Sequence, residues 1–250
     1  MSAPHAFILH LARATARREN AEVLLAGCGM DAEIWPAVDG AALSQTERDA
    51  MLGAQLIKPA YPFALKPGEL GCFLSHRAIW AEMVARRLDW ALVLEDDAAL
   101  DPNIFPQALH LATARVAQMG YIQLQNRAPR APLQEIAAKG PCILSQATLT
   151  PLRTTAQVVS LEAARRLLAL SDRIDRPVDS FLQSHWHTGL RLGTIYPAGI
   201  SSVDAQLAGS TIQGGKKSVV GTLTREWRRF VFRRKVAQAA RQSPTPEAGE

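Results

Sequence analysis

The sequence has little of what secreted and membrane-spanning proteins usually carry. Its cysteines, Cys28, Cys72 and Cys142, are odd in number, widely spaced and not arranged as a C-x-x-C pair. They indicate neither a disulfide framework nor a zinc site, and they favour a reducing compartment. No stretch approaches the roughly 18 to 20 consecutive apolar residues that a membrane-spanning helix needs. The apolar start, residues 6–12, is short and contains His10. We therefore expect a first strand rather than a signal peptide, and a cytoplasmic protein.

Acidic residues are scarce in the last part of the chain. Residues 216–250 hold nine Lys/Arg and three Glu, which leaves 19 basic and 20 acidic residues in the nearly neutral remainder. A helix there would place four apolar side chains near one side, flanked by arginines: Trp227, Phe230, Val231 and Val236. This pattern favours a helix that lies on anionic lipid, with docking on its own domain or a nonspecific basic tail as alternatives. Because no recognition module is visible, we expect no nucleic-acid partner.

The length of 250 residues and the hydrophobic content of 48% allow one large α/β domain with an appendage. We expect a domain over residues 1–215, a basic amphipathic helix over 216–241 and a disordered tail over 242–250. Strands are expected at residues 6–11, 34–38, 90–94, 121–124, 154–160 and 194–197. Helices are expected up to about residue 27, at 44–52, 67–88, 102–119 and 160–170, and after Pro177. Residues 58–67 and 127–132 should be loops, and the poorly patterned residues 134–151 a flexible flap.

The most informative phrase is a buried strand that runs into three acids. The apolar run of residues 90–94 suits a strand covered on both faces, and Glu95, Asp96 and Asp97 follow it directly. Three carboxylates there would repel one another and lose hydration unless a cation lies among them. On an extended backbone, Glu95 and Asp97 project to one side and Asp96 to the other. A hard divalent ion such as Mg²⁺ or Mn²⁺ fits this arrangement, and a solvated acidic turn without a ligand is the alternative.

Basic residues lie where the first strand turns into the first helix. Arg13 and Arg17 oppose the helix dipole there. Their position makes sense if the turn faces an anion such as a diphosphate, although ordinary surface arginines are the alternative. Asp39-Gly40 ends the second strand in the usual chemistry of a turn. The same aspartate could instead hold a ribose hydroxyl.

Two further positions carry side chains that could take part in chemistry. Ser75 and His76 lie in the middle of the helix expected at residues 67–88. A histidine beside an apolar helix face is more often a hydrogen-bonded structural residue than a catalyst. Asp179 follows Pro177 near a helix N-terminus, where capping alone would explain it.

Together these phrases resemble glycosyltransferase family 25, which contains bacterial lipooligosaccharide galactosyltransferases and animal collagen galactosyltransferases. The resemblance covers roughly residues 5–212 and departs from the family at two places. The first strand ends in H-L-A-R where an N-L-D-R type of phrase is usual, and Gln157 stands where an aromatic is common. The matching phrases are A-V-D-G at 37–40, G-E-L-G-C-F-L-S-H at 68–76, L-V-L-E-D-D at 92–97, P-V-D at 177–179 and Y-P at 196–197.

The resemblance implies a GT-A-like, Rossmann-type αβα sandwich with a mixed, mostly parallel sheet. In a D-x-D-like role, Asp97 would ligate Mn²⁺ (or Mg²⁺), and Glu95 would complete the metal site or approach the ribose. Asp179 is the implied catalytic base, with Glu69 and Asp96 in reserve. The residues expected to bind substrate are Arg13, Arg17, Asp39, Ser75, His76, Glu95 and Asp96.

The implied reaction is the metal-dependent transfer of galactose or another hexose from a UDP-sugar, with inversion at the anomeric carbon. The acceptor would be a cell-envelope glycan or glycolipid such as lipooligosaccharide. The basic tail would then hold the protein peripherally on the inner face of the cytoplasmic membrane. The alternative is a catalytically weak or inactive relative that binds or scaffolds without turnover.

Overall fold

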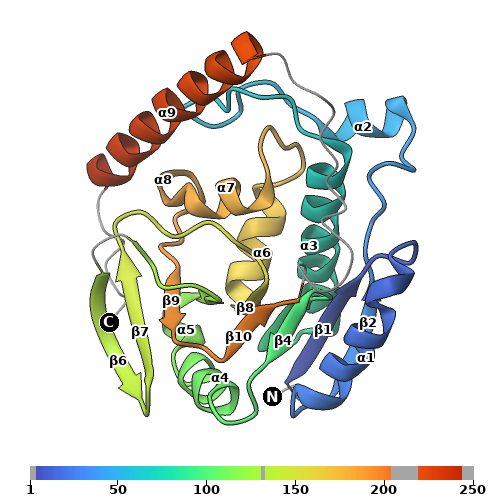
Figure 1. Cartoon of the computed structure of the whole chain (residues 1–250), viewed down its shortest axis with the longest axis vertical. Coiled ribbons are helices and arrows are strands. Elements are labelled where there is room, and N and C mark those ends of the chain that lie inside the picture. The colour runs from blue at the N-terminus through green and yellow to red at the C-terminus, as the bar shows by residue number, and fades with distance from the viewer. Residues whose placement is uncertain (1–3, 131–132, 204–218, 244–250) are drawn as a thin grey trace.

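A computed structural model describes residues 4–130, 133–203 and 219–243 (Figure 1). Its centre is an eight-stranded sheet in the order β2-β1-β3-β8-β5-β9-β7-β6, and a two-stranded sheet pairs β10 with β4. The bounds of the strands are β1 His5–His10, β2 Ala32–Pro36, β3 Trp90–Glu95, β4 Ala98–Leu100, β5 Tyr121–Leu124, β6 Leu133–Lys139, β7 Cys142–Ala147, β8 Ala156–Ser160, β9 Gly193–Tyr196 and β10 Ile200–Ser202.

The large sheet is mixed, and most of its strands point the same way. β2, β1 and β3 are mutually parallel, β5 and β9 are parallel, and β8 and β7 run against their neighbours. Since β6 is antiparallel to β7, six of the eight strands share one direction. The predicted mixed, mostly parallel sheet is thereby confirmed, and the carboxyl ends of β2, β1 and β3 meet at one edge.

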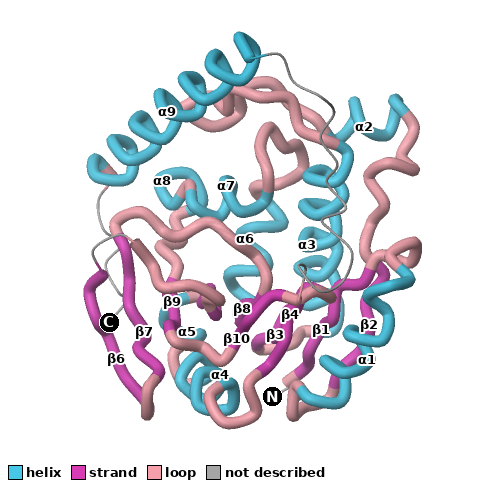
Figure 2. Tube along the Cα trace, viewed as in Figure 1, coloured by secondary structure: helices cyan, strands magenta, loops and turns pink. Residues whose placement is uncertain are grey.

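Helices cover both faces of this sheet (Figure 2). Side chains of β1 alternate, with Ala6 and Ile8 in the core shared with α1, α4 and α5, and Phe7 and Leu9 in the core shared with α3, α6 and α7. The predicted αβα sandwich is therefore correct. The helix bounds are α1 Arg18–Gly27, α2 Gln45–Met51, α3 Pro67–Arg86, α4 Phe105–Thr113, α5 Val116–Met119, α6 Leu161–Ala169, α7 Val178–Gln183, α8 His185–Thr188 and α9 Val219–Gln242, with a 3₁₀ turn η1 Thr15–Arg17 before α1.

Several segments differ from the expectation. Residues 134–151, expected as a flap, mostly form the hairpin β6-β7 at the end of the sheet. β6 is exposed along nearly all its length, so it carries no alternation of apolar and polar residues that would mark a strand. The single helix expected at residues 102–119 is divided into α4 and α5. The short strands β4 and β10 were not expected.

The last helix, α9, docks on the domain beside α8 (Figure 1). Phe232 packs edge-on against Tyr61 with ring centroids 5.4 Å apart, and Val236 and Ala240 are buried. The prediction that Val236 lies on a lipid-facing side of the helix is therefore wrong, because this residue faces the domain. Trp227 and Phe230 are exposed. No helix among the described residues is long and apolar enough to cross a membrane. The expected boundary at residue 215 and most of the expected tail lie outside the described residues.

Candidate functional site

Two of the sequence phrases meet at the start of α3. A Cβ atom on Gly71 would lie 2.5 Å from the carbonyl oxygen of Val38, and one on Gly40 would lie 1.8 Å from that of Pro67. Both positions need glycine because the two backbones touch. Ser75 fixes the contact, since its hydroxyl donates to Gly71 O at 2.7 Å and accepts from Val38 N at 2.8 Å. The hydroxyl expected to bind substrate thus holds the loop against α3.

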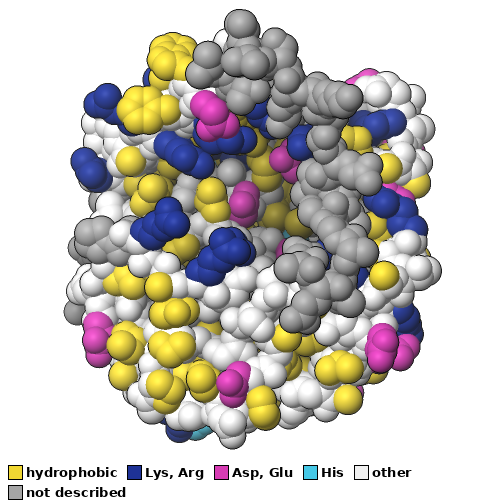
Figure 3. All heavy atoms as spheres, viewed as in Figure 1, with side chains coloured by type: hydrophobic (Ala, Val, Ile, Leu, Met, Phe, Trp, Pro, Cys, Tyr) yellow, Lys and Arg dark blue, Asp and Glu magenta, His cyan; other side chains and the backbone are white. Residues whose placement is uncertain are grey.

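This contact forms part of the wall of a pocket of about 540 Å³, a volume in the range of small-ligand sites. The pocket opens at the carboxyl edge of β1, β2 and β3, and Figure 3 shows a hollow near the centre of that view with acidic and basic side chains around it. Every site residue expected from the sequence lines it except His76. The set comprises Arg13, Arg17, Asp39, Glu69, Ser75, Glu95, Asp96, Asp97 and Asp179.

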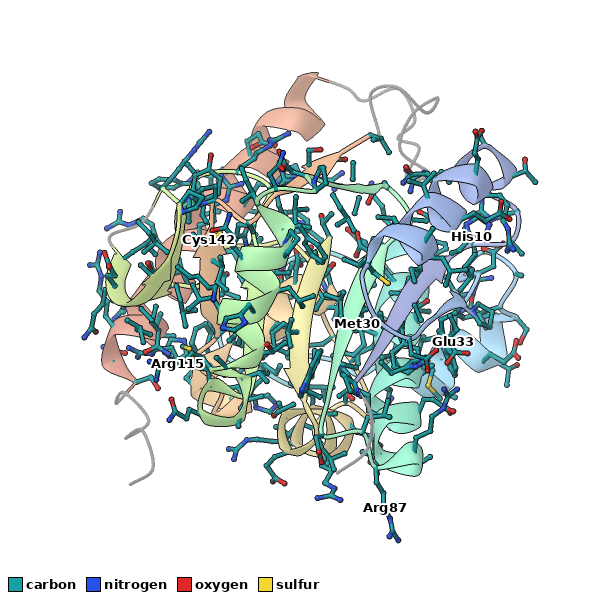
Figure 4. The ribbon with its side chains drawn as sticks, turned by 90° about the horizontal axis from the view of Figure 1, so that it is seen from below. His10, Met30, Glu33, Arg87, Arg115 and Cys142 are labelled. Atoms are coloured by element: carbon teal, nitrogen blue, oxygen red, sulfur yellow. The ribbon has the colours of Figure 1, made fainter. Side chains whose placement is uncertain are left out.

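Asp96 is buried and engaged on both carboxylate oxygens. His10 Nδ1 lies 2.8 Å from Asp96 Oδ2, and Arg17 Nη1 donates to Oδ1 at 3.0 Å. Asn20 donates to the backbone oxygens of Asp96 and Ala98, both at 2.8 Å. Asp96 therefore orients Arg17, whose Nη1 also lies 4.0 Å from Asp97 Oδ2. His10, labelled in Figure 4, and Asn20 were not predicted as site residues.

Glu95 lies at the end of β3 with its carboxylate among three neighbours. Thr154 donates its hydroxyl to Glu95 Oε1 at 2.7 Å, and His76 Nε2 lies 3.5 Å from the same oxygen. Burial alone would raise the pKa of Glu95, but His76, Thr154 and the charge of Arg17 outweigh it and lower the pKa below its usual value. Glu95 is therefore ionised at neutral pH. His76 is 1% exposed, so in this structure it reaches Glu95 and not the pocket that was expected for it.

Arg13 and Asp39, both expected to bind substrate, pair with each other at the pocket rim. Arg13 Nε donates to Asp39 Oδ2 at 2.6 Å, and this guanidinium lowers the pKa of Asp39. Asp39 also accepts a hydrogen bond from Ala41 N at 3.0 Å, the turn role that its sequence position suggested. Half of the Arg13 side chain is exposed, so it can exchange Asp39 for an incoming anion.

Two more carboxylates face the pocket from helix starts. Asp179 lies in the first turn of α7, where its Oδ1 accepts from Ser180 N at 2.6 Å. Burial raises the pKa of Asp179, and the negative charges of Glu95 and Glu69 add to the effect. Glu69 accepts from Lys66 N at 2.8 Å and so caps α3. A carboxylate with a raised pKa suits a general base, which favours Asp179.

Several pocket residues had no signal in the sequence. Tyr61 lies in the proline-rich loop and connects the pocket to α9 through Phe232. Burial raises the pKa of Tyr61 to about 12, so its hydroxyl stays protonated and can donate a hydrogen bond. Thr154 and Arg153 precede β8, and Arg153 adopts a φ of 139°, a strained value for a residue other than glycine. Strain of this kind often accompanies binding sites.

Two carboxylates on the pocket wall are of the type that binds hard metal ions. Asp97 and Glu95 offer carboxylate oxygens on its wall, which fit Mn²⁺ or Mg²⁺ when water and phosphate oxygens complete the coordination shell. Among the described residues, however, the group that brings three ligand atoms within 4.8 Å of one another is Cys72, His76 and Glu95, not the acid triplet. Burial, followed by the charge of Glu95, raises the pKa of the Cys72 thiol well above its usual value.

The sequence of this chain matches the model of one protein family over most of its length. Residues 3–182 match the model of glycosyltransferase family 25, described as an LPS biosynthesis protein. This chain belongs to glycosyltransferase family 25. The phrases at residues 37–40, 68–76 and 92–97, which contribute to the pocket wall, all lie inside the matched range.

Curated family 25 relatives include proteins with different names. A glycosyltransferase 25 family member of Drosophila melanogaster is 35% identical over 195 residues, which cover 73% of this chain and 30% of that one. A probable inactive family member 3 of Bos taurus is 35% identical over 70% of this chain and 30% of its own. Procollagen galactosyltransferase 2 of Homo sapiens is 29% identical over 70% of this chain and 29% of its own. The chain thus spans less than a third of the length of each of these relatives.

Solved structures resemble the family 25 chain more weakly. A glycosyltransferase involved in the glycosylation of the major capsid of PBCV-1 gives a TM-score of 0.36 at 13% identity, over 68% of this chain and 66% of that one. A mannose-1-phosphate geranyltransferase from Thermus thermophilus gives 0.34 at 12% identity, over 78% and 74%. The architecture of the chain depends on neither likeness.

Proposed function

We propose that this family 25 protein transfers a hexose, galactose being the first candidate, from a UDP-sugar to a cell-envelope glycan. The observation that carries the proposal is the joint placement of Glu95, Asp97 and Arg17 in one pocket at the carboxyl edge of parallel strands. Open α/β sheets bind nucleotides at this edge. The pocket volume and its mixture of arginines and carboxylates suit a sugar linked to a diphosphate.

The donor end of the pocket binds and orients the diphosphate. Arg17 is held by Asp96 with its guanidinium beside Asp97, and Arg13 lies across the rim on Asp39. Both can donate charge-assisted hydrogen bonds to phosphate oxygens. Asp97 and Glu95 would hold Mn²⁺ or Mg²⁺, which, when bound, neutralises charge on the departing nucleoside diphosphate. Asp39 remains the candidate for the ribose hydroxyls.

The acceptor hydroxyl must lose a proton during an inverting transfer, and Asp179 is the proposed base. It lines the same pocket as Glu95, and its raised pKa makes it a better proton acceptor than an exposed aspartate. Glu69 is a weaker candidate because one of its oxygens already caps α3. Asp96 is weaker still, since both of its oxygens are engaged.

The acceptor is proposed to be carried by a membrane. On the outer side of α9, Trp227 and Phe230 are 65% and 56% exposed, and the Arg234 guanidinium lies 5.8 Å from the Phe230 ring. Exposed aromatics with arginines on a helix that is itself docked suit contact with anionic lipid. Tyr61 joins α9 to the pocket, which would bring a lipid-linked saccharide close to Asp179. This supports a peripheral position on the cytoplasmic membrane.

A second candidate function is binding without turnover. Family members of cow, rat and mouse that are 35% or 36% identical to this chain carry the word inactive in their names. Such a protein would keep the pocket for a sugar nucleotide or glycan and would release no UDP. The presence of Glu95, Asp97 and Asp179 in one pocket favours the active form.

Release of UDP decides between the two. The full chain is incubated with UDP-galactose or UDP-glucose, Mn²⁺ and lipooligosaccharide, and free UDP is measured. We expect release to require Mn²⁺ and to fall at least about 100-fold in Asp97→Asn, because a bound metal lowers the activation barrier by several kcal/mol. Asp31→Asn is the matched control, since Asp31 precedes β2 at the opposite edge of the sheet with its side chain 78% exposed. UDP binding without release of UDP from any donor would favour the binding protein.

A further inference from the structure

Below the proposed donor pocket, three side chains of different chemistry converge. Cys72 and His76 are four residues apart on α3 and so lie on the same side of the helix. Glu95 reaches them from the end of β3. One ligand atom of each residue lies within 4.8 Å of the other two. The spacing of the cysteines could not reveal this group, because its third member comes from another element.

The distances are close to those of a tetrahedral metal site. Bond lengths of about 2.3 Å to sulfur and about 2.0–2.2 Å to nitrogen and oxygen place ligand atoms about 3.4–3.6 Å apart at tetrahedral angles. His76 Nε2 is 3.5 Å from Glu95 Oε1, and Cys72 Sγ is 4.0 Å from the same oxygen. A cation at the centre therefore requires the ligand atoms, which lie within 4.8 Å of one another, to move closer together.

His76 provides an independent observation that points to a ligand. Its ring is 1% exposed, and its buried Nε2 lies 3.5 Å from Glu95 Oε1, an ion-pair contact that lacks hydrogen-bond geometry. A contact of this length satisfies a buried ring nitrogen only poorly. A metal ion bound between Nε2 and Glu95 would satisfy both atoms.

The next layer of residues fits the same ion. Gln157 is fully buried, with its side-chain nitrogen 3.5 Å from His76 Nδ1 and its Oε1 without a partner among the described residues. When a metal occupies Nε2, the ring proton lies on Nδ1 and needs an acceptor. Turning the Gln157 amide by half a rotation presents Oε1 to that proton. Gln157, which departs from the family pattern, would then orient the ligand.

We propose that Cys72, His76 and Glu95 form a second metal site, which binds a thiophilic divalent cation of the zinc class. Thiolate and imidazole ligands select such ions over Mn²⁺ and Mg²⁺, which prefer oxygen. Cys72 and Glu95 line the pocket, so the ion enters from there and water fills the fourth position. Binding replaces the thiol proton of Cys72 by the metal, and that proton leaves to solvent.

Cobalt(II) tests the site directly, because it takes the place of zinc and a thiolate–cobalt bond absorbs strongly in the near ultraviolet. Metal-free full-length protein is titrated with Co²⁺ in the absence of any nucleotide. We expect one equivalent to produce the thiolate band together with the visible bands of tetrahedral cobalt. Cys72→Ser should lose the thiolate band, and Gln157→Leu should weaken cobalt binding by about 10–100-fold.

The other two cysteines are the matched controls. Cys28 and Cys142 are free and buried elsewhere, so Cys28→Ser and Cys142→Ser should keep the band. Circular dichroism checks that each variant is folded, and His76→Asn, which keeps the thiol, tests the site if Cys72→Ser unfolds. The proposal is overturned if wild-type protein gives no thiolate band, or if the band persists in folded Cys72→Ser or at unchanged affinity in His76→Asn.

The consequence for turnover rests on the proposed function, whereas the cobalt spectrum does not. Glu95 belongs to both sites, so an ion held by Cys72 and His76 withdraws it from the donor. Micromolar Zn²⁺ should therefore inhibit Mn²⁺-dependent UDP release, and Gln157→Leu should need more Zn²⁺ for the same inhibition. A cobalt spectrum without any UDP release would uphold the metal site and refute the transferase.

Discussion

The two ends of the sheet differ in almost every respect. The end formed by β2, β1, β3 and β8 brings charged side chains to one edge, and all pocket residues that border strands lie next to these four. At the other end, the hairpin β6-β7 contributes no described residue to the pocket, and β6 is exposed along nearly its whole length. Most charged residues of the site lie at or just after the carboxyl ends of β1, β2 and β3, and no described residue of the hairpin lines the pocket. Substitutions should therefore act very differently at the two ends.

The largest effect is expected at the proposed base. Asp179→Asn should lower the rate of UDP release in the presence of the glycan acceptor by about 10²–10⁴-fold. The reason is that the attacking hydroxyl loses the base that takes its proton. The pKa of Asp179 is raised above its usual value of 3.8, so the wild-type rate should rise with pH as this carboxyl group ionises. The variant should lack this rise in its pH–rate profile. Initial rates across pH measure both.

The same variant makes a prediction for stability. Burial raises the pKa of Asp179, so the folded protein holds this proton more tightly than the unfolded chain. Ionising Asp179 therefore costs folding free energy as pH rises above 3.8, and the asparagine variant should be at least as stable as the wild type at neutral pH.

The control for turnover is Glu69→Gln, which neutralises another carboxylate of the same pocket. A larger loss of turnover in Glu69→Gln would exchange the two assignments.

A smaller effect is expected where the loop of residues 37–40 touches α3. Gly71→Ala would place a Cβ atom 2.5 Å from the Val38 carbonyl oxygen, so the two backbones must separate. Gly27→Ala is the matched control, because Gly27 also lies in a helix and a Cβ atom there meets nothing within 4 Å. Both variants gain helix propensity, and the difference isolates the clash. Urea denaturation should show Gly71→Ala less stable by about 1–3 kcal/mol. Equal stabilities would contradict the tight contact.

The smallest effect is expected in the hairpin. Ile136 in β6 is 42% exposed, and threonine keeps its β-branched shape. Ile136→Thr should change the free energy of unfolding by less than about 0.5 kcal/mol and leave UDP release unchanged. A large loss of activity in this variant would mean that the hairpin takes part in the site, and the contrast between the two ends of the sheet would fail.

The sequence predicted the buried part of the fold well. β3 and α3 begin where expected, because a run of five apolar residues and a Pro-Gly start are strong local signals. It failed for β6 and for the division between α4 and α5. β6 has no buried face to impose a pattern, and residues 114–115, which separate the two helices, contain neither proline nor glycine. At such positions the secondary structure is determined by tertiary packing and not by the local sequence.

For the site, the sequence located acids and arginines but not their partners. Glu95 and Asp97 were found because charges at the end of a buried strand are unusual. Arg17 was found because a cation at the start of a helix opposes the helix dipole. Thr154, which hydrogen-bonds Glu95, is 59 residues away in the chain, and His10 is 86 residues from Asp96. Pairings over such separations depend on the order of strands in the sheet, which no local pattern of residues reveals.

The contact between α9 and Tyr61 has a practical consequence. Phe232 covers the Tyr61 ring, and the guanidinium groups of Arg225 and Arg229 stack on Phe63 next to it. A protein shortened before residue 219 would expose both rings to water and leave the loop that carries them without backing. The terminal helix should therefore be kept whenever this molecule is trimmed for crystallisation or assay, even though it lies outside the family match.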